Sequence, residues 1–175
     1  MAKLAFSKLG LKLDNNIEQI DFNNQIVEVK KYLPIQDKLD IIGNAINLEK
    51  EYNNNSFLNI PLLIMLIDLE IVYAYTNLSF TEKQKEDITK LYDLMESNGF
   101  INLLKENIQE EYSYILNHTI ECAKLSYDYK NSAYGLLDSL QNNYDNLNLD
   151  ANSIQQKLAD PENMDLLRQV LAKLG

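Results

Sequence analysis

The sequence has one cysteine, one histidine and no tryptophan in 175 residues. Cys122 has no second cysteine to pair with, so an internal disulfide is excluded. His118 cannot form a metal site alone, and no second imidazole remains to activate Cys122 or a serine. We therefore expect His118 on a helix surface or partly buried, and Cys122 buried and structural. We expect no cofactor, no metal and no enzymatic activity.

Glycine and basic residues are also scarce. The five glycines are isolated from one another, which excludes a glycine-rich phosphate-binding loop. The chain has only 16 Lys and Arg but 26 Asp and Glu, which gives a net charge of −10. Because phosphate contacts need clustered basic side chains, we expect no nucleic-acid partner.

Long apolar runs are missing as well. The most apolar stretch, residues 61–75, is shorter than the roughly 20 residues that a membrane span needs, and it contains Asp68 and Glu70. We interpret it as a core helix whose two acids mark the edges of a buried face. Residues 1–10 are too polar for a signal peptide. We therefore expect a cytoplasmic protein with no membrane partner.

The sequence does contain a clear change of periodicity at Pro34. Residues 17–22 and 25–33 alternate like two strands around residues 23–24, where two asparagines suit the positive φ angles of a type I′ turn. A lone hairpin is marginal in water, so its apolar face must pack on the helices or on another chain. The register predicts Ile20, Phe22, Val27 and Val29 on this face and Glu18, Glu28 and Lys30 on the other.

From Pro34 onward the periodicity is helical. A helix begins at Pro34 and ends before a loop at 53–55, with Leu39, Ile42, Ala45 and Ile46 as its apolar stripe. Further helices are expected over 59–77, 81–97, 100–107, 110–144 (bent near Gly135), 151–159 and 161–174, with a capping box at Thr81 and Gln84. The expected fold is mainly α: an N-terminal β-hairpin followed by a compact bundle of about five to seven helices. We treat 1–175 as one domain, with a hairpin arm (1–33) and a helical body (34–175).

Tyrosines cluster in the long helix expected over 110–144, where Ile115, Cys122, Tyr129, Leu136 and Leu140 form the predicted apolar stripe. The tyrosines cannot all face one core, so either they pack at the core rim or some contact another chain. For the exposed face of the helix expected over 161–174 the same two alternatives stay open: packing at the core rim or contact with another chain. The candidate partner-binding residues are Ile20, Phe22, Val27, Val29, Tyr127, Tyr134, Leu167, Val170 and Leu171.

Four segments, residues 1–13, 20–34, 80–85 and 157–163, resemble a small protein of tailed bacteriophages of low-GC hosts. The chain is similar in its acidity, size and hairpin-plus-helices pattern to phage tail assembly chaperones. That resemblance implies a non-enzymatic protein of the host cytoplasm that binds the tape-measure protein, helps recruit tail-tube protein, and associates with itself. The family has no catalytic motif to carry over. Two alternatives stay open: a structural virion protein of the connector or tail, and an acidic inhibitor of a host defence.

Overall fold

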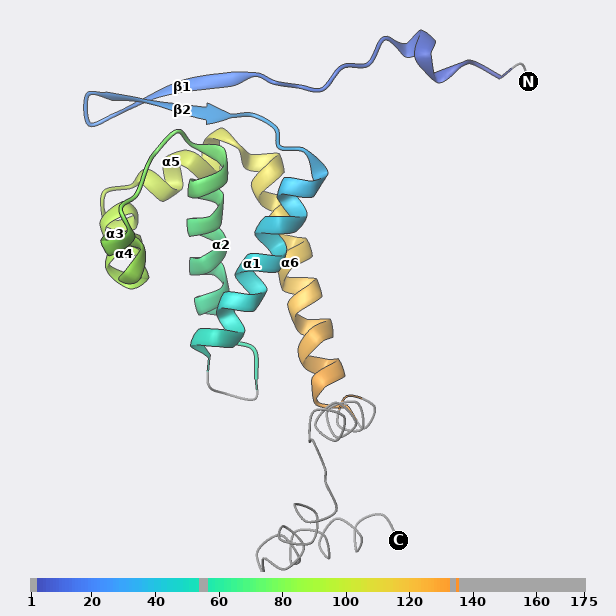
Figure 1. Cartoon of the computed structure of the whole chain (residues 1–175). Helices are drawn as coiled ribbons and strands as arrows, with labels where there is room; N and C mark the ends of the chain where they lie inside the picture. The colour runs from blue at the N-terminus through green and yellow to red at the C-terminus, as the bar shows by residue number, and fades with distance from the viewer. Residues whose placement is uncertain (1–2, 54–56, 133–134, 136–175) are drawn as a thin grey trace, which may run out of the picture. The chain divides into compact units, whose positions relative to one another are not determined.

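The computed structural model describes residues 3–53, 57–132 and 135. The chain divides into two compact units, Met1–Asp128 and Tyr129–Gly175, and almost all of the second lies outside the described residues. The first unit is an antiparallel β-hairpin followed by helices, which confirms the expected mainly α fold (Figure 1). The single-domain organisation of 1–175 stays a prediction.

The hairpin forms as its sequence predicts. Strand β1 (Ile17–Phe22) pairs with β2 (Gln25–Lys30). Asn23 and Asn24 have φ angles of 54° and 61°, as a type I′ turn requires. The second strand ends at Lys30, three residues earlier than expected.

One side-chain placement on the hairpin was wrong. Glu18 lies opposite Val29, so it belongs to the face of Ile20 and not to the face of Glu28. Side chains two apart on a strand share a face, which puts 18, 20 and 22 together. Glu18 stays exposed and forms an ion pair with Lys31 at 2.8 Å. The hydrogen bond from Lys31 is the main cause that lowers the pKa of Glu18.

Helices α1 (Ile35–Tyr52) and α2 (Ile60–Tyr75) pack together below the hairpin. The predicted core helix is therefore confirmed: α2 is buried along most of its length. Its N-cap is Asn59, whose side chain accepts from the backbone N–H of Leu62. Just after α2, Thr76 forms a bridge with Val29 of β2. This bridge ties the end of α2 to the edge of the hairpin.

The helix expected over 81–97 is two helices, α3 (Glu82–Glu86) and α4 (Ile88–Ser97). The break falls at Asp87, whose carboxylate caps α4 by accepting from the backbone N–H of Lys90. The capping box at the start of α3 is present as predicted. Helix α5 (Phe100–Asn107) follows Gly99, whose φ of 80° suits a residue without a Cβ.

Helix α6 (Gln109–Lys130) is shorter than the predicted 110–144. Its backbone turns at Ser132, whose Oγ donates to the carbonyl of Tyr129 and accepts from the N–H of Gly135. The predicted stripe through Cys122 and Tyr129 was also wrong, because both residues are exposed. The buried positions are instead spaced by four, so each lies about one turn of the helix after the last. They are Ile115, Thr119, Ala123 and Tyr127.

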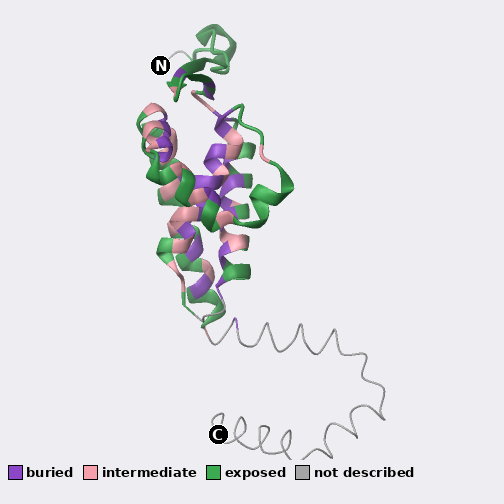
Figure 2. Ribbon diagram, turned by 90° about the vertical axis from the view of Figure 1, so that its left-hand side faces the viewer, coloured by how far each residue is buried: buried purple, intermediate pink, exposed green. Residues whose placement is uncertain are grey.

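The core of the first unit lies between the hairpin and helices α1, α2, α5 and α6. Figure 2 shows the buried residues on the inward sides of the helices and the exposed ones outside. The N-terminal arm, defined here as residues 3–13, contributes nothing to this core and is exposed throughout. It contains one 3-10 turn, η1 (Phe6–Leu9). The helices predicted over 151–159 and 161–174 lie outside the described residues.

Candidate functional site

Three carboxylates, Glu49, Asp68 and Glu111, sit between the helices, and each accepts a hydrogen bond from a tyrosine hydroxyl. They come from α1, α2 and α6 respectively. A carboxylate between helices is costly unless its oxygens are paired, so their partners decide what they can do.

Asp68 is fully enclosed, since its side chain is 0% exposed. The ammonium of Lys105 lies 2.8 Å from its Oδ2. The hydroxyls of Tyr92 and Tyr112 donate to it at 3.1 and 3.0 Å. Burial, followed by the charge of Asp68, raises the pKa of both tyrosines, so they remain protonated donors. This cluster joins α2 to α4, α5 and α6.

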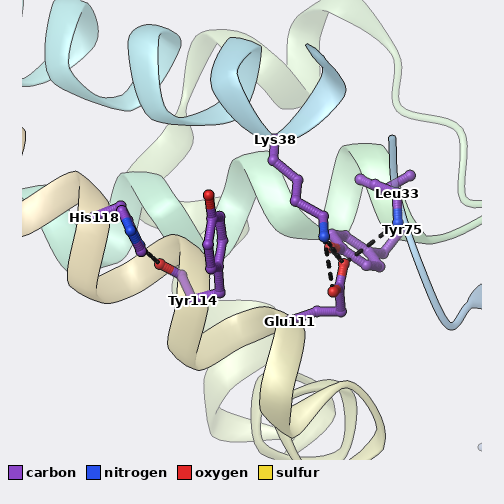
Figure 3. Close-up of polar contacts among 6 residues, drawn as sticks. All are labelled: Leu33, Lys38, Tyr75, Glu111, Tyr114 and His118. Atoms are coloured by element: carbon purple, nitrogen blue, oxygen red, sulfur yellow. Dashed lines mark hydrogen bonds and ion pairs between the residues drawn. The ribbon is translucent and has the colours of Figure 1, made fainter. Parts of the chain in front are cut away.

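Glu111 forms a second cluster, drawn in Figure 3. The ammonium of Lys38 lies 2.8 Å from Glu111, and the hydroxyl of Tyr75 donates to the same carboxylate at 2.8 Å. The backbone N–H of Leu33 also donates to it, at 3.3 Å. Burial is the main cause that raises the pKa of Tyr75, and the bond to Glu111 adds to it. The cluster connects α1, α2 and α6 beneath the end of the hairpin.

Glu49 forms the third cluster, at the other end of α1. It accepts from the hydroxyl of Tyr127 at 2.8 Å, from the side-chain amide of Asn53 at 2.6 Å and from the backbone N–H of Asn59 at 2.9 Å. Burial raises the pKa of Tyr127. One carboxylate thereby holds α6 and both ends of the loop that joins α1 to α2.

These clusters act as structural locks, that is, as polar contacts that hold neighbouring helices together. Within the part of the chain that the structure describes, no buried side-chain nitrogen or oxygen lacks a partner. A carboxylate with each oxygen already engaged is poorly placed to exchange a proton with a substrate. Asp68 and Glu70 do not act as a pair. Asp68 was expected at the edge of the buried face, which was wrong, because it is enclosed among the helices. Glu70 is partly buried and accepts from the side chain of Asn44.

His118 and Cys122 do not come together in a reactive arrangement. His118 is exposed, and its Nδ1 lies 2.8 Å from the carbonyl of Tyr114, against whose ring it packs (Figure 3). Cys122 is exposed, so the prediction of a buried, structural cysteine was wrong. Over residues 3–53 and 57–132, no three His, Cys, Asp or Glu side chains gather into a possible metal site.

The structure places five of the predicted partner-binding residues. Ile20, Val27 and Val29 are buried in the core of the same chain, and Phe22 packs edge-on against Phe100 with ring centroids 5.0 Å apart. Tyr127 is buried in the Glu49 cluster. Most of the hairpin face thus packs on the helices of its own chain, whereas Phe22 stays partly exposed. The other four, Tyr134, Leu167, Val170 and Leu171, lie outside the described residues.

A different apolar surface is open on helix α1. Ile35 and Leu39 are 54% and 50% exposed, although Leu39 was expected in the core stripe. Each residue turns a helix by about 100°, so the inward face that includes Ile41, Ile42 and Ala45 leaves Leu39 outside. Gly43 follows on the same face, and a Cβ at Gly43 would meet nothing within 4 Å. We call Ile35, Leu39 and Gly43 the α1 stripe.

The sequence held a signal for this stripe. A glycine inside a helix costs about 1 kcal/mol relative to alanine, so its presence asks for a reason. Gly43 lies four residues after Leu39 and eight after Ile35, which are same-face spacings on a helix. A glycine at such a position lets another backbone approach closely.

Comparisons with protein-family models, with curated proteins and with solved structures found no match. No helix within the described ranges combines the length and apolar character that a membrane span requires.

Proposed function

We propose that this protein is a non-enzymatic tail assembly chaperone of a tailed bacteriophage that binds the tape-measure protein through the α1 stripe. The single observation that carries the proposal is the open apolar face formed by Ile35, Leu39 and Gly43. An amphipathic helix can lay its apolar side onto such a face, and Gly43 at one end of the stripe allows close contact. The sequence resemblance supplies the expected partner, because a tape-measure protein is a long helix with an apolar stripe.

The arrangement of the body supports the same role. The Glu49 and Glu111 clusters tie α1 to α2 and α6, so the α1 stripe is presented on a rigid support. A preorganised surface loses less conformational entropy when a partner binds. The net charge of −10 favours solubility of a complex whose partner is strongly apolar.

Co-expression with the tape-measure protein of the same phage tests this function. We expect more of the tape-measure protein in the soluble fraction, and a complex of the two that co-purifies. If the solubility is unchanged and no complex is recovered, the chaperone proposal is wrong. Mass spectrometry of purified virions separates the structural alternative, since a chaperone is scarce in the particle and a connector or tail protein is stoichiometric.

A further inference from the structure

The N-terminal arm differs in charge from the rest of the chain. Residues 1–13 contain Lys3, Lys8 and Lys12 and no acidic residue, so the other 162 residues hold 13 Lys and Arg against all 26 Asp and Glu. The arm is therefore a short basic segment on a strongly acidic protein.

The same arm exposes large apolar side chains. Their exposed fractions run from 51% to 75%, well above those of core residues. Within the described part of the molecule, the arm packs against no core element. Apolar side chains of this size are stabilised by burial. The composition of the arm is therefore typical of a segment whose side chains become buried against another surface. These side chains are Leu4, Phe6, Leu9, Leu11 and Leu13.

An apolar groove lies at the turn end of the hairpin, between the hairpin, the loop after α2, and α4. Its cavity volume is about 440 Å³. Leu78 and Leu94 stand at 37% and 56% exposure, while Phe22, Phe80, Met95 and Phe100 line it more deeply. None of the described residues that line the groove is acidic. The groove thus offers apolar depth on a chain that is strongly acidic outside the arm.

We propose that the N-terminal arm of one copy docks into this groove on a second copy of the same chain. The apolar side chains of the arm match the apolar lining, and the three lysines of the arm are attracted by the strongly acidic remainder of the second copy. This interface is separate from the α1 stripe and from tape-measure binding, so each can fail without the other.

The path of the chain favours docking of the arm in the groove of a second copy over docking in the groove of the same chain. The arm joins β1 at Ile17, whereas the groove begins at Phe22 and the turn, at the opposite end of that strand. Five steps along a strand cover roughly 17 Å, and the arm would have to reverse direction to return over that distance. No arm residue lines the groove. Exchange of a terminal segment between identical chains is a low-cost route to association.

Because the arm and the groove are different parts of the surface, docking of one copy's arm in another copy's groove is a head-to-tail contact. Such contacts close into a ring, or a reciprocal pair, or continue as an open chain, depending on the rotation between copies. Each copy has one arm that can dock and one groove that can bind an arm. The association is therefore expected to involve several copies and to depend on concentration.

Sedimentation velocity on the full chain across a concentration series tests the proposal. The arm variant carries Phe6→Ser with Leu9→Ser, and the groove variant carries Leu94→Lys. The matched control is Leu125→Ser, which removes an apolar side chain of 63% exposure outside both surfaces. All the changed side chains are largely exposed, so circular dichroism should show an unchanged fold. Should Leu94→Lys disturb folding, Leu78→Lys replaces it as the groove variant.

We expect the wild type and the control to self-associate, and the arm and groove variants each to do so at least tenfold more weakly. A mixture of these two variants restores one intact groove and one intact arm, so it should form a one-to-one complex. A wild type that stays monomeric would overturn the proposal. So would an arm variant that associates as well as the control, or a mixture of the two variants that stays monomeric. Arm-dependent binding of the monomer to phosphatidylglycerol vesicles would overturn it in favour of a membrane surface.

Discussion

Replacing Asp68 by asparagine removes the charge of a fully enclosed carboxylate while leaving the side-chain size nearly unchanged. Asp68 accepts from Lys105 and Tyr92 on one oxygen and from Tyr112 on the other. The amide group of asparagine carries donors in place of one of these acceptors. One side of the cluster must therefore lose its hydrogen bonds, whichever way the amide turns.

The size of the effect follows from what is left behind. Removing one partner of a buried ion pair costs about 3 to 5 kcal/mol when the other charge stays buried. The side chain of Lys105 is 27% exposed, so it can recover part of its hydration. We therefore expect Asp68→Asn to lower the free energy of unfolding by about 2 to 4 kcal/mol. Tyr92→Phe and Tyr112→Phe each lose one hydrogen bond to a charged group, and each should cost about 1.5 to 3 kcal/mol.

Urea unfolding followed by circular dichroism measures these differences. Double-mutant cycles between Asp68→Asn and each tyrosine variant should show strong coupling, because the residues share one cluster. A value for Asp68→Asn within about 0.5 kcal/mol of the wild type, as is usual for surface substitutions, would refute the account of the cluster as a structural lock.

Three further predictions test other parts of the description. Ile20→Ser should lower the free energy of unfolding by about 3 kcal/mol, since Ile20 is 7% exposed in the core; unchanged thermal stability would place the hairpin face outside it. Cys122 should react with a maleimide in the native protein about as fast as in urea, and strong protection would contradict its exposure. Burial raises the pKa of Glu70, so ionisation of Glu70 disfavours folding as pH rises through that pKa. Glu70→Gln should therefore raise stability at pH 7, as measured by urea titration, with a gain that vanishes below pH 4.5; a gain that is independent of pH would count against this assignment.

The hairpin was predictable because its signals are local. The two asparagines fix the turn, and the turn fixes the register of the strands. The caps at Thr81 and Asn59 and the left-handed Gly99 act over three or four residues, so they too can be read from short segments. Signals of this kind depend little on the rest of the fold.

The polar clusters could not be predicted, because their partners are far apart in the sequence. Glu49 and Tyr127 are 78 residues apart, and Lys38 and Glu111 are 73 apart. Lys38 illustrates the consequence: it is buried through its contacts with Glu111 and the ring of Tyr32, and this turns Leu39 outward. Periodicity treats a lysine as a surface residue and a leucine as a core residue, so it wrongly placed Leu39 with Ile42, Ala45 and Ile46 on the inward face of α1.

The most direct test of the proposed function is the amount of tape-measure protein that co-purifies with α1 stripe variants. The test variant carries Ile35→Ser with Leu39→Ser, and Ile26→Ser is the control, since Ile26 is 58% exposed on the outer face of the hairpin. Losing two apolar contacts of about 1.5 kcal/mol each should weaken binding roughly 100-fold. We expect the stripe variant to lose the tape-measure protein and the control to retain it. Equal recovery with both variants, at unchanged stability, would contradict the assignment of the α1 stripe as the binding surface.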